Sequence, residues 1–90
     1  MAKIKFTSAL KPFFPLLTDL EVEGNTVREL VAQAEVRFPG ISTYLMDETG
    51  SLRKHVNIFV QGDLIKDRKQ LSDSVNSSDE LLIFQALSGG

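Results

Sequence analysis

The sequence predicts an α+β roll, in which one main helix packs on one face of a β-sheet. Short segments with alternating apolar and polar residues recur near both ends of the chain, as in half-buried strands. One segment between them has apolar residues at helical spacing. The chain has 90 residues, which is enough for one hydrophobic core. We therefore expect a single domain over residues 1–90 that ends in a flexible tail at about 86–90.

Two strands are predicted before the helix. Residues 2–7, AKIKFT, alternate apolar and polar side chains, and residues 20–23, LEVE, do so again. The second segment is followed by Gly24-Asn25, a typical turn signal. Between the two strands lies PFFP at 12–15, which predicts a loop whose aromatic rings must find cover.

The main helix is predicted to begin after Thr26. Thr26 and Glu29 have capping-box spacing: the Thr26 hydroxyl accepts from the Glu29 amide, and the Glu29 carboxylate reaches back. Pro39-Gly40 should end the helix, and residues 41–45 suit a short second helix. The apolar residues at helical spacing are Val27, Leu30, Val31, Ala34 and Phe38.

The remaining segments predict three more strands. Residues 56–61, VNIFVQ, alternate most regularly. Gly62-Asp63 should turn the chain, Leu64-Ile65 should form a short return strand, and residues 80–87 should form the last strand. Because a crossover helix joins strands that run parallel, the first and last strands can lie side by side at the sheet centre. The predicted fold is therefore a β-grasp roll with a mixed sheet of about four to five strands.

The side chains offer no catalytic set. The sequence has no cysteine, which excludes disulfides, thiolate metal sites and a cysteine nucleophile. His55 is the lone histidine, and a catalytic triad needs three groups in mutual contact, so we interpret His55 as a surface or half-buried structural residue. The pairs Asp47-Glu48 and Asp79-Glu80 lack calcium-loop spacing. We expect no catalytic residue, no metal site and no cofactor.

The charge pattern narrows the classes of partner. The formal net charge is −2, and the ten lysine and arginine residues are scattered, which argues against nucleic acid. Lys3, Lys5 and Lys11 interrupt every apolar stretch that could form a signal-peptide core, and no apolar run reaches membrane-spanning length. We expect a cytoplasmic protein without membrane or nucleic-acid partners, which is a monomer when free.

Strand geometry predicts an apolar patch on the sheet face that the helix leaves open. Phe59 in one strand, and Leu82 and Phe84 in the last, point away from the face that a single helix can cover. One interpretation is that the loop at 12–15 folds over them. The other is a docking surface with Leu87 nearby, which we favour because exposed apolar patches mark partner sites and aromatic residues suit interface centres.

The sequence ends in Leu87-Ser88-Gly89-Gly90. Glycine has no Cβ, so a Gly-Gly tail can lie extended in a narrow channel while an enzyme backbone approaches closely. Beside a docking patch, this tail predicts insertion into a partner's active site, with the Gly90 carboxylate as the reactive group. A carboxylate is a poor electrophile at neutral pH, and activation as an acyl-adenylate would supply a leaving group.

Several stretches carry a resemblance to known proteins. Residues 58–73, IFVQGDLIKDRKQLSD, match a stretch of ubiquitin in length and share its glycine and LSD. GNTVRELV at 24–31, HVNIFVQG at 55–62 and DELLIF with the final SGG resemble the prokaryotic sulfur carriers of the MoaD/ThiS family. The resemblance covers effectively the whole chain and implies a ubiquitin-like β-grasp fold.

The resemblance implies a carrier that is a substrate rather than an enzyme. A ubiquitin-activating-type enzyme would adenylate the Gly90 carboxylate with ATP, with Gly89 as the slender link. A sulfur donor would then form a thiocarboxylate, which supplies sulfide to an acceptor enzyme. The aromatic position that corresponds to Phe84 would pack on the partner, beside Phe59 and Leu82.

The resemblance leaves the acceptor open. Gln85 and Ala86 replace a Pro-Pro pair that is usual in the small subunit of molybdopterin synthase. Residues 45–60 look closer to carriers for cysteine or other amino-acid biosynthesis and to archaeal small modifiers. The acceptor is therefore a cysteine-synthase-like enzyme or a molybdopterin-synthase large subunit, with thiamine synthesis a further route. The alternatives are a modifier joined to lysines through Gly90 and a plain ubiquitin-like interaction module.

Overall fold

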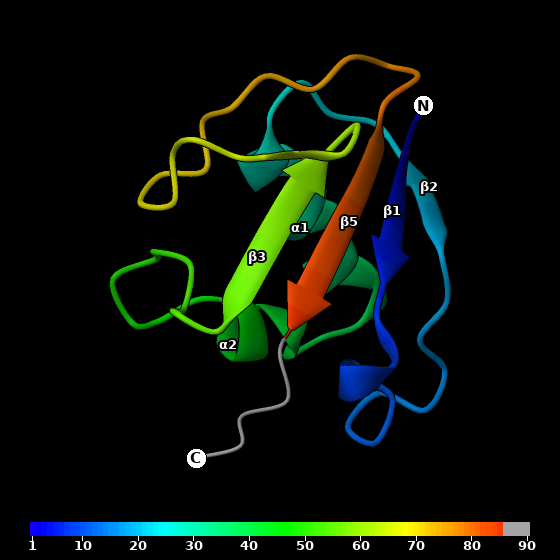
Figure 1. Ribbon diagram of the computed structural model, residues 1–90. Coiled ribbons are helices and arrows are strands. Elements are labelled where there is room, and N and C mark those ends of the chain that lie inside the picture. The colour runs from blue at the N-terminus through cyan, green and yellow to red at the C-terminus, as the bar shows by residue number, and fades with distance from the viewer. Residues whose placement is uncertain (86–90) are drawn as a thin grey trace.

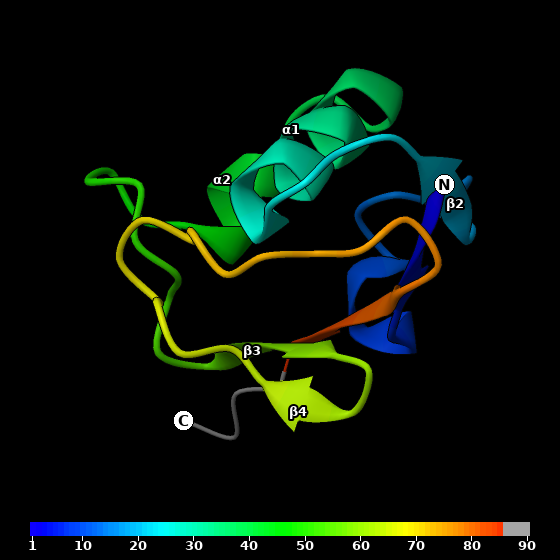
Figure 2. The ribbon, with the colours of Figure 1, turned by 90° about the horizontal axis from the view of Figure 1, so that it is seen from above.

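Two strands from opposite ends of the chain, β1 and β5, form the centre of the sheet. The computed structural model describes residues 1–85, and five strands form one mixed sheet in the order β2-β1-β5-β3-β4. β1 and β5 are parallel, and the other neighbouring pairs are antiparallel, which confirms the predicted β-grasp roll. Both helices lie on one side of the sheet (Figure 1, Figure 2). The elements are β1 (Ala2–Phe6), η1 (Ser8–Leu10), β2 (Leu20–Val22), α1 (Val27–Arg37), α2 (Ile41–Leu45), β3 (Val56–Val60), β4 (Asp63–Leu64) and β5 (Glu80–Gln85).

The start of α1 has the predicted cap, with one difference. The Glu29 amide donates to the Thr26 hydroxyl at 3.2 Å, as in a capping box. The Glu29 carboxylate, however, accepts from the amide of Asn25 at 2.6 Å rather than from that of Thr26. Thr26 itself forms an isolated antiparallel bridge with Ser74, so the loop before β5 holds the backbone at the helix start.

Removal of the Thr26 hydroxyl is expected to destabilise α1. The substitution Thr26→Ala leaves the Glu29 amide without its acceptor, and the loss of such a cap lowers the free energy of unfolding by about 1 kcal/mol. Urea unfolding followed by circular dichroism measures the change. Thr18→Ala, in the exposed loop before β2, is the matched control and should leave the midpoint unchanged. Equal midpoints for Thr26→Ala and the wild type would contradict the cap.

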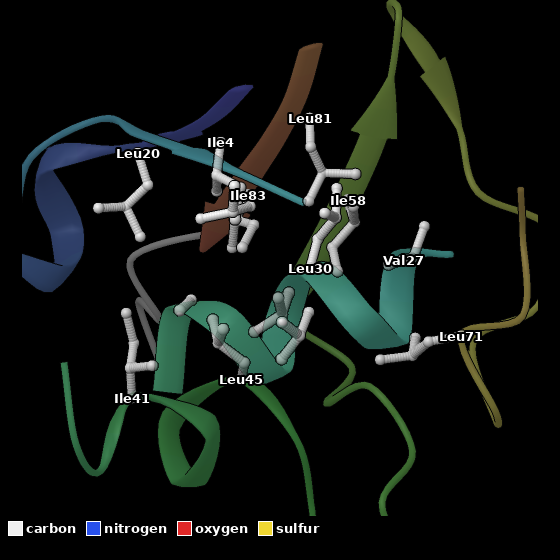
Figure 3. Close-up of a cluster of buried hydrophobic side chains, with 14 of the residues drawn as sticks. Ile4, Leu20, Val27, Leu30, Ile41, Leu45, Ile58, Leu71, Leu81 and Ile83 are labelled. Atoms are coloured by element: carbon white, nitrogen blue, oxygen red, sulfur yellow. The ribbon is translucent and has the colours of Figure 1, made fainter. Parts of the chain in front are cut away.

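The core lies between the sheet and the two helices. The inward residues of β1, β3 and β5 point toward Leu30 of α1 and Leu45 of α2 (Figure 3). Each of these two leucines is fully buried. Phe38 follows α1 and packs edge-on against Phe6 at 6.0 Å between ring centres. The largest fully buried inward strand residues are Ile4, Val56, Ile58, Leu81 and Ile83.

The turn after β3 comes one residue earlier than predicted. Gln61 and Gly62 both have positive φ, 51° and 85°, as in the two-residue hairpin turns that match the twist of the strands. Val60 therefore pairs with Asp63, and the return strand is Asp63–Leu64 rather than Leu64-Ile65. Ile65 still donates its amide to the Ile58 carbonyl at 3.0 Å and is buried against the core.

One carboxylate organises the connection after β4. Asp67 accepts hydrogen bonds from the hydroxyl of Ser72 and from the amides of Lys69, Gln70 and Ser72. The Ser72 hydroxyl, followed by the Gln70 amide, lowers the pKa of Asp67 from 3.8 to about 2. Asp73 accepts the amide of Asp67 in turn. The two carboxylates thus fix a loop that has little regular secondary structure.

The low pKa of Asp67 predicts an acid-dependent loss of stability. Because its pKa is lower in the folded than in the unfolded chain, the ionised form favours folding above about pH 4, and this contribution disappears as the pH falls toward 2. Asp67→Asn should therefore be less stable at neutral pH and should lose less stability between pH 4 and pH 2. Urea unfolding at several pH values measures this slope. Asp19→Asn, in an exposed loop, is the charge-matched control, and identical slopes for both variants would contradict the prediction.

The described helices are short. Among residues 1–85, none has the length and apolar character needed to cross a membrane.

Candidate functional site

Four apolar side chains gather on the sheet face opposite the helices. Leu82 of β5 lies opposite Phe59 of β3, and Phe59 lies opposite Leu64 of β4, so the three form one row across three strands. Phe84 lies two residues further along β5, on the same face, opposite Asn57. We call Phe59, Leu64, Leu82 and Phe84 the outer-face patch. Leu64 is 51% and Phe84 41% exposed, whereas Phe59 and Leu82 are half-buried.

No other described segment covers this patch. Both helices lie above the sheet in Figure 2, and among residues 1–85 no segment lies below β3 and β4 in that view. The less favoured interpretation, in which the loop at 12–15 folds over the patch, is wrong. Phe13 and Phe14 instead surround Tyr44 of α2, with ring centres at 4.8 Å and 5.3 Å. Tyr44 offers them an apolar partner on the helix side of the sheet, which leaves the patch free for a partner as far as residues 1–85 are concerned.

Polar groups border the outer-face patch. Lys5 of β1 lies opposite Leu82 and pairs with Glu80 at 3.5 Å. The Gln61 side chain accepts the Glu80 amide at 2.6 Å, which ties the β3–β4 turn to the start of β5. A shallow open hollow crosses this region, lined by Phe59, Gln61, Gly62, Ser78, Glu80 and Leu82. An apolar centre within a polar rim is the usual anatomy of a protein–protein interface.

The outer-face patch includes a residue next to the end of the described chain. Phe84 precedes Gln85, the last described residue, which lies opposite Val56 at the start of β3. Of the predicted site residues, the structure brings Phe59, Leu82 and Phe84 together on one face. Leu87, Gly89 and Gly90 lie outside the described residues.

His55, which we interpreted as a structural residue, is half-buried at the end of the sheet. Its Nε2 lies 3.5 Å from the Gln85 side-chain nitrogen, and within residues 1–85 no carboxylate forms an ion pair with it. The Asp47 carboxylate is used within its own turn, where the Thr49 hydroxyl and amide and the Ser51 amide donate to it. These bonds, that of the Thr49 hydroxyl first, lower the pKa of Asp47. Neither group is placed for acid–base catalysis.

The sequence interpretation missed Leu64 as a member of the patch. Its place depends on the turn at Gln61-Gly62, which puts Leu64 opposite Phe59. A two-residue turn ending in glycine is a known hairpin signal, but glutamine is not a residue that favours its first position, so the signal in the sequence was weak. The contact of Tyr44 with Phe13 and Phe14 could not be predicted from the sequence, because these two residues lie in a loop without periodicity.

The comparisons with known proteins agree with this geometry. The ThiS family model matches residues 5–90. Sulfur carrier protein CysO of Mycobacterium tuberculosis is 26% identical over 89 residues, which is 97% of this chain and 96% of that protein. A chain of the Amycolatopsis orientalis BexX/CysO complex superposes with a TM-score of 0.84 and 25% identity, with complete coverage of both chains.

The fold is also found in an archaeal protein. SAMP1 from Haloferax volcanii superposes with a TM-score of 0.77 at 22% identity, covering 99% of this chain and 98% of that one. At this identity the likeness concerns the fold. The family match extends over nearly the whole chain, and it includes the strands that carry the outer-face patch and the two final glycines. The chain belongs to the ThiS family.

Proposed function

We propose that this protein is a sulfur carrier whose Gly90 carboxylate is converted to a thiocarboxylate. The observation that carries the proposal is the match of the ThiS family model to residues 5–90, a range that includes Gly89 and Gly90. The relative in Mycobacterium tuberculosis named a sulfur carrier supports it, because the two chains align over nearly their full lengths. The protein is then the substrate of other enzymes rather than an enzyme itself.

The chemistry proceeds in two balanced steps. A Gly90 carboxylate oxygen attacks the α-phosphorus of ATP, the bond to the β,γ-diphosphate breaks, and pyrophosphate leaves. A hydrosulfide-level sulfur nucleophile then attacks the acyl carbon, and AMP leaves with the oxygen. If the sulfur arrives as a persulfide, a second thiol must take the other sulfur as a disulfide. The chain's own contribution is to present a tail without bulky side chains at Gly89 and Gly90.

The outer-face patch is proposed to bind the enzyme that acts on the tail. Phe59, Leu82 and Phe84 provide the apolar contact, and Leu87 extends it toward the tail. Phe84 is six residues from Gly90, and an extended segment of this length spans about 20 Å, so a partner on the patch can reach the terminus. Docking would hold the tail in the active site, which raises its effective concentration there.

The acceptor of the sulfur is proposed to be a cysteine-synthase-like enzyme. The curated relative is named CysO, which favours this route over a molybdopterin-synthase large subunit. Activation and delivery are proposed to take place in the cytoplasm. We expect the thiocarboxylate form, mixed with each acceptor and its co-substrate, to lose its sulfur only with the cysteine-synthase-like enzyme. Loss only to the molybdopterin-synthase subunit would contradict this choice of acceptor.

The proposed carrier differs from a protein modifier in its acceptor. A modifier would use the same activated Gly90 but would form isopeptide bonds with lysines. Digestion of cell proteins with a protease that cleaves after Leu87, such as chymotrypsin, followed by mass spectrometry detects the Ser-Gly-Gly remnant that such a bond leaves on a lysine. We expect thiocarboxylate on the free chain and no remnant derived from it. Abundant remnants without any thiocarboxylate would favour the modifier.

A further inference from the structure

A second surface lies where β5 ends and the tail begins. Gln85 closes β5, and the residues just before β3 lie beside it because Val56 pairs with Gln85. A hollow at this point is lined by Thr43, Tyr44, Arg53, His55 and Gln85. We call these five residues, together with the neighbouring Lys54, the sheet-end rim. It is separate from the outer-face patch, with which it shares no residue.

The rim concentrates positive charge in a chain whose formal net charge is −2. Arg53, Lys54 and His55 are consecutive, and among residues 1–85 the only ion pair within 4 Å is that of Lys5 with Glu80. Arg53 donates through Nε to the Thr43 carbonyl at 3.1 Å, which orients the guanidinium. Within residues 1–85, its two terminal nitrogens donate no hydrogen bond. Such a guanidinium suits a carboxylate, which it can bind through two parallel hydrogen bonds.

The nearest acidic side chains of the same chain do not fill this role. Asp47 and Glu48 line a neighbouring hollow that also includes Arg53. The Asp47 carboxylate already accepts the Thr49 hydroxyl at 2.6 Å and amides from its own turn. It forms no ion pair with Arg53 within 4 Å. The Thr49 hydroxyl lowers the pKa of Asp47 most, and Asp47 is close enough to Arg53 for the arginine charge to contribute. Even so, no carboxylate within residues 1–85 forms an ion pair with Arg53, Lys54 or His55.

The rim also has an apolar flank and an unused acceptor. Phe13 is 56% exposed although its ring lies 4.8 Å from that of Tyr44, so one aromatic surface remains open to solvent. The Gln85 side-chain oxygen is buried and has no hydrogen-bond partner within residues 1–85.

We propose that the sheet-end rim is a second docking surface, which binds a carboxylate-bearing segment of the adenylating enzyme. This inference rests on the proposed function. A carboxylate would bind the Arg53 guanidinium, with Lys54 and His55 beside it, and an apolar side chain of the same segment would pack on Phe13. The rim borders the start of the tail, so contact there would direct the tail toward the enzyme while the outer-face patch supplies most of the apolar contact.

Charge reversal at the rim tests the proposal. The assay is ATP–pyrophosphate exchange by the ubiquitin-activating-type enzyme of the same organism, with the concentration of the full-length carrier varied. We expect Arg53→Glu and Lys54→Glu each to raise the KM for the carrier about tenfold or more, with kcat unchanged. The KM of these variants should also depend less on the salt concentration than that of the wild type. The matched control is Lys66→Glu, the same charge change at an exposed residue after β4, which should behave as the wild type.

The results separate this inference from the proposed function. If the wild-type chain supports no exchange, the proposed function itself fails. If it does, and if both rim variants have the KM of Lys66→Glu, the rim inference is overturned while the proposed function stands. Lys54 is exposed, so Lys54→Glu should fold even if Arg53→Glu is destabilised by loss of its bond to Thr43. A third outcome is that the free wild-type chain self-associates, that both rim variants abolish this self-association, and that their KM values are unchanged. The rim would then bind a second copy of this chain, which would overturn the inference.

Discussion

A chain with one alanine added after Gly90 is expected to form no thiocarboxylate and to support no pyrophosphate exchange. In the proposed chemistry, the Gly90 carboxylate is the group that attacks ATP. The added residue converts that carboxylate into an amide, and it moves the new terminus about 3.5 Å further along an extended chain. The loss should therefore be complete rather than partial. Intact-mass spectrometry after incubation with the activating enzyme, ATP and a sulfur donor measures it.

The matched control for this extension is an alanine added before Met1. Both additions leave the described core unchanged, because the inward residues of the sheet lie between Ala2 and Ile83. Both chains should therefore unfold at the same urea concentration as the wild type. Normal sulfur transfer by the chain extended after Gly90 would show that the terminus is not the reactive group, as expected for a plain interaction module.

The second large effect is expected from Phe84→Ala in the outer-face patch. The Phe84 side chain is 41% exposed in the free protein and would be buried by a partner on this face. Truncation of an aromatic residue at an interface centre costs roughly 2 kcal/mol or more, which corresponds to about a 30-fold loss. We expect kcat/KM for activation to fall by that factor, measured by pyrophosphate exchange with the concentration of carrier varied.

Val36→Ala provides the control for Phe84→Ala. Val36 is 73% exposed on α1, on the other side of the sheet from the patch. Its truncation also removes an exposed apolar group, and it should leave kcat/KM unchanged. Both variants should have a thermal unfolding midpoint close to that of the wild type, because substitutions at exposed positions change stability little. Equal kcat/KM for Phe84→Ala and Val36→Ala would exclude the patch as the docking surface.

The sequence was informative wherever a regular period extended over several residues. Ile58 and Phe59 alternate within a five-residue strand, so the inward and outward faces of β3 were assigned correctly. The same reasoning placed Leu82 and Phe84 on the outer face of β5. The α1 helix was also predicted, because a capping threonine precedes five apolar residues at helical spacing, four of which are buried within the helix.

Irregular segments were harder to predict because tertiary contacts determine their positions. The loop at 12–15 has no period, and only Tyr44 explains why its two rings turn toward the helices. The short strand β4 was displaced by one residue, since Gln61 adopts a positive φ that is uncommon for a side chain of this size. The sheet-end rim joins residues from α2, the segment before β3 and the end of β5, and no local pattern links these segments.

The most direct test of the central claim is the intact mass of the wild-type chain. The chain is incubated with a ubiquitin-activating-type enzyme, ATP and a sulfur donor, and is then fragmented to locate the modification. We predict a mass increase equal to the difference between sulfur and oxygen, confined to a C-terminal fragment that contains Gly90. An unchanged mass, under conditions in which the same enzyme activates its established carrier, would contradict the assignment of this protein as a sulfur carrier.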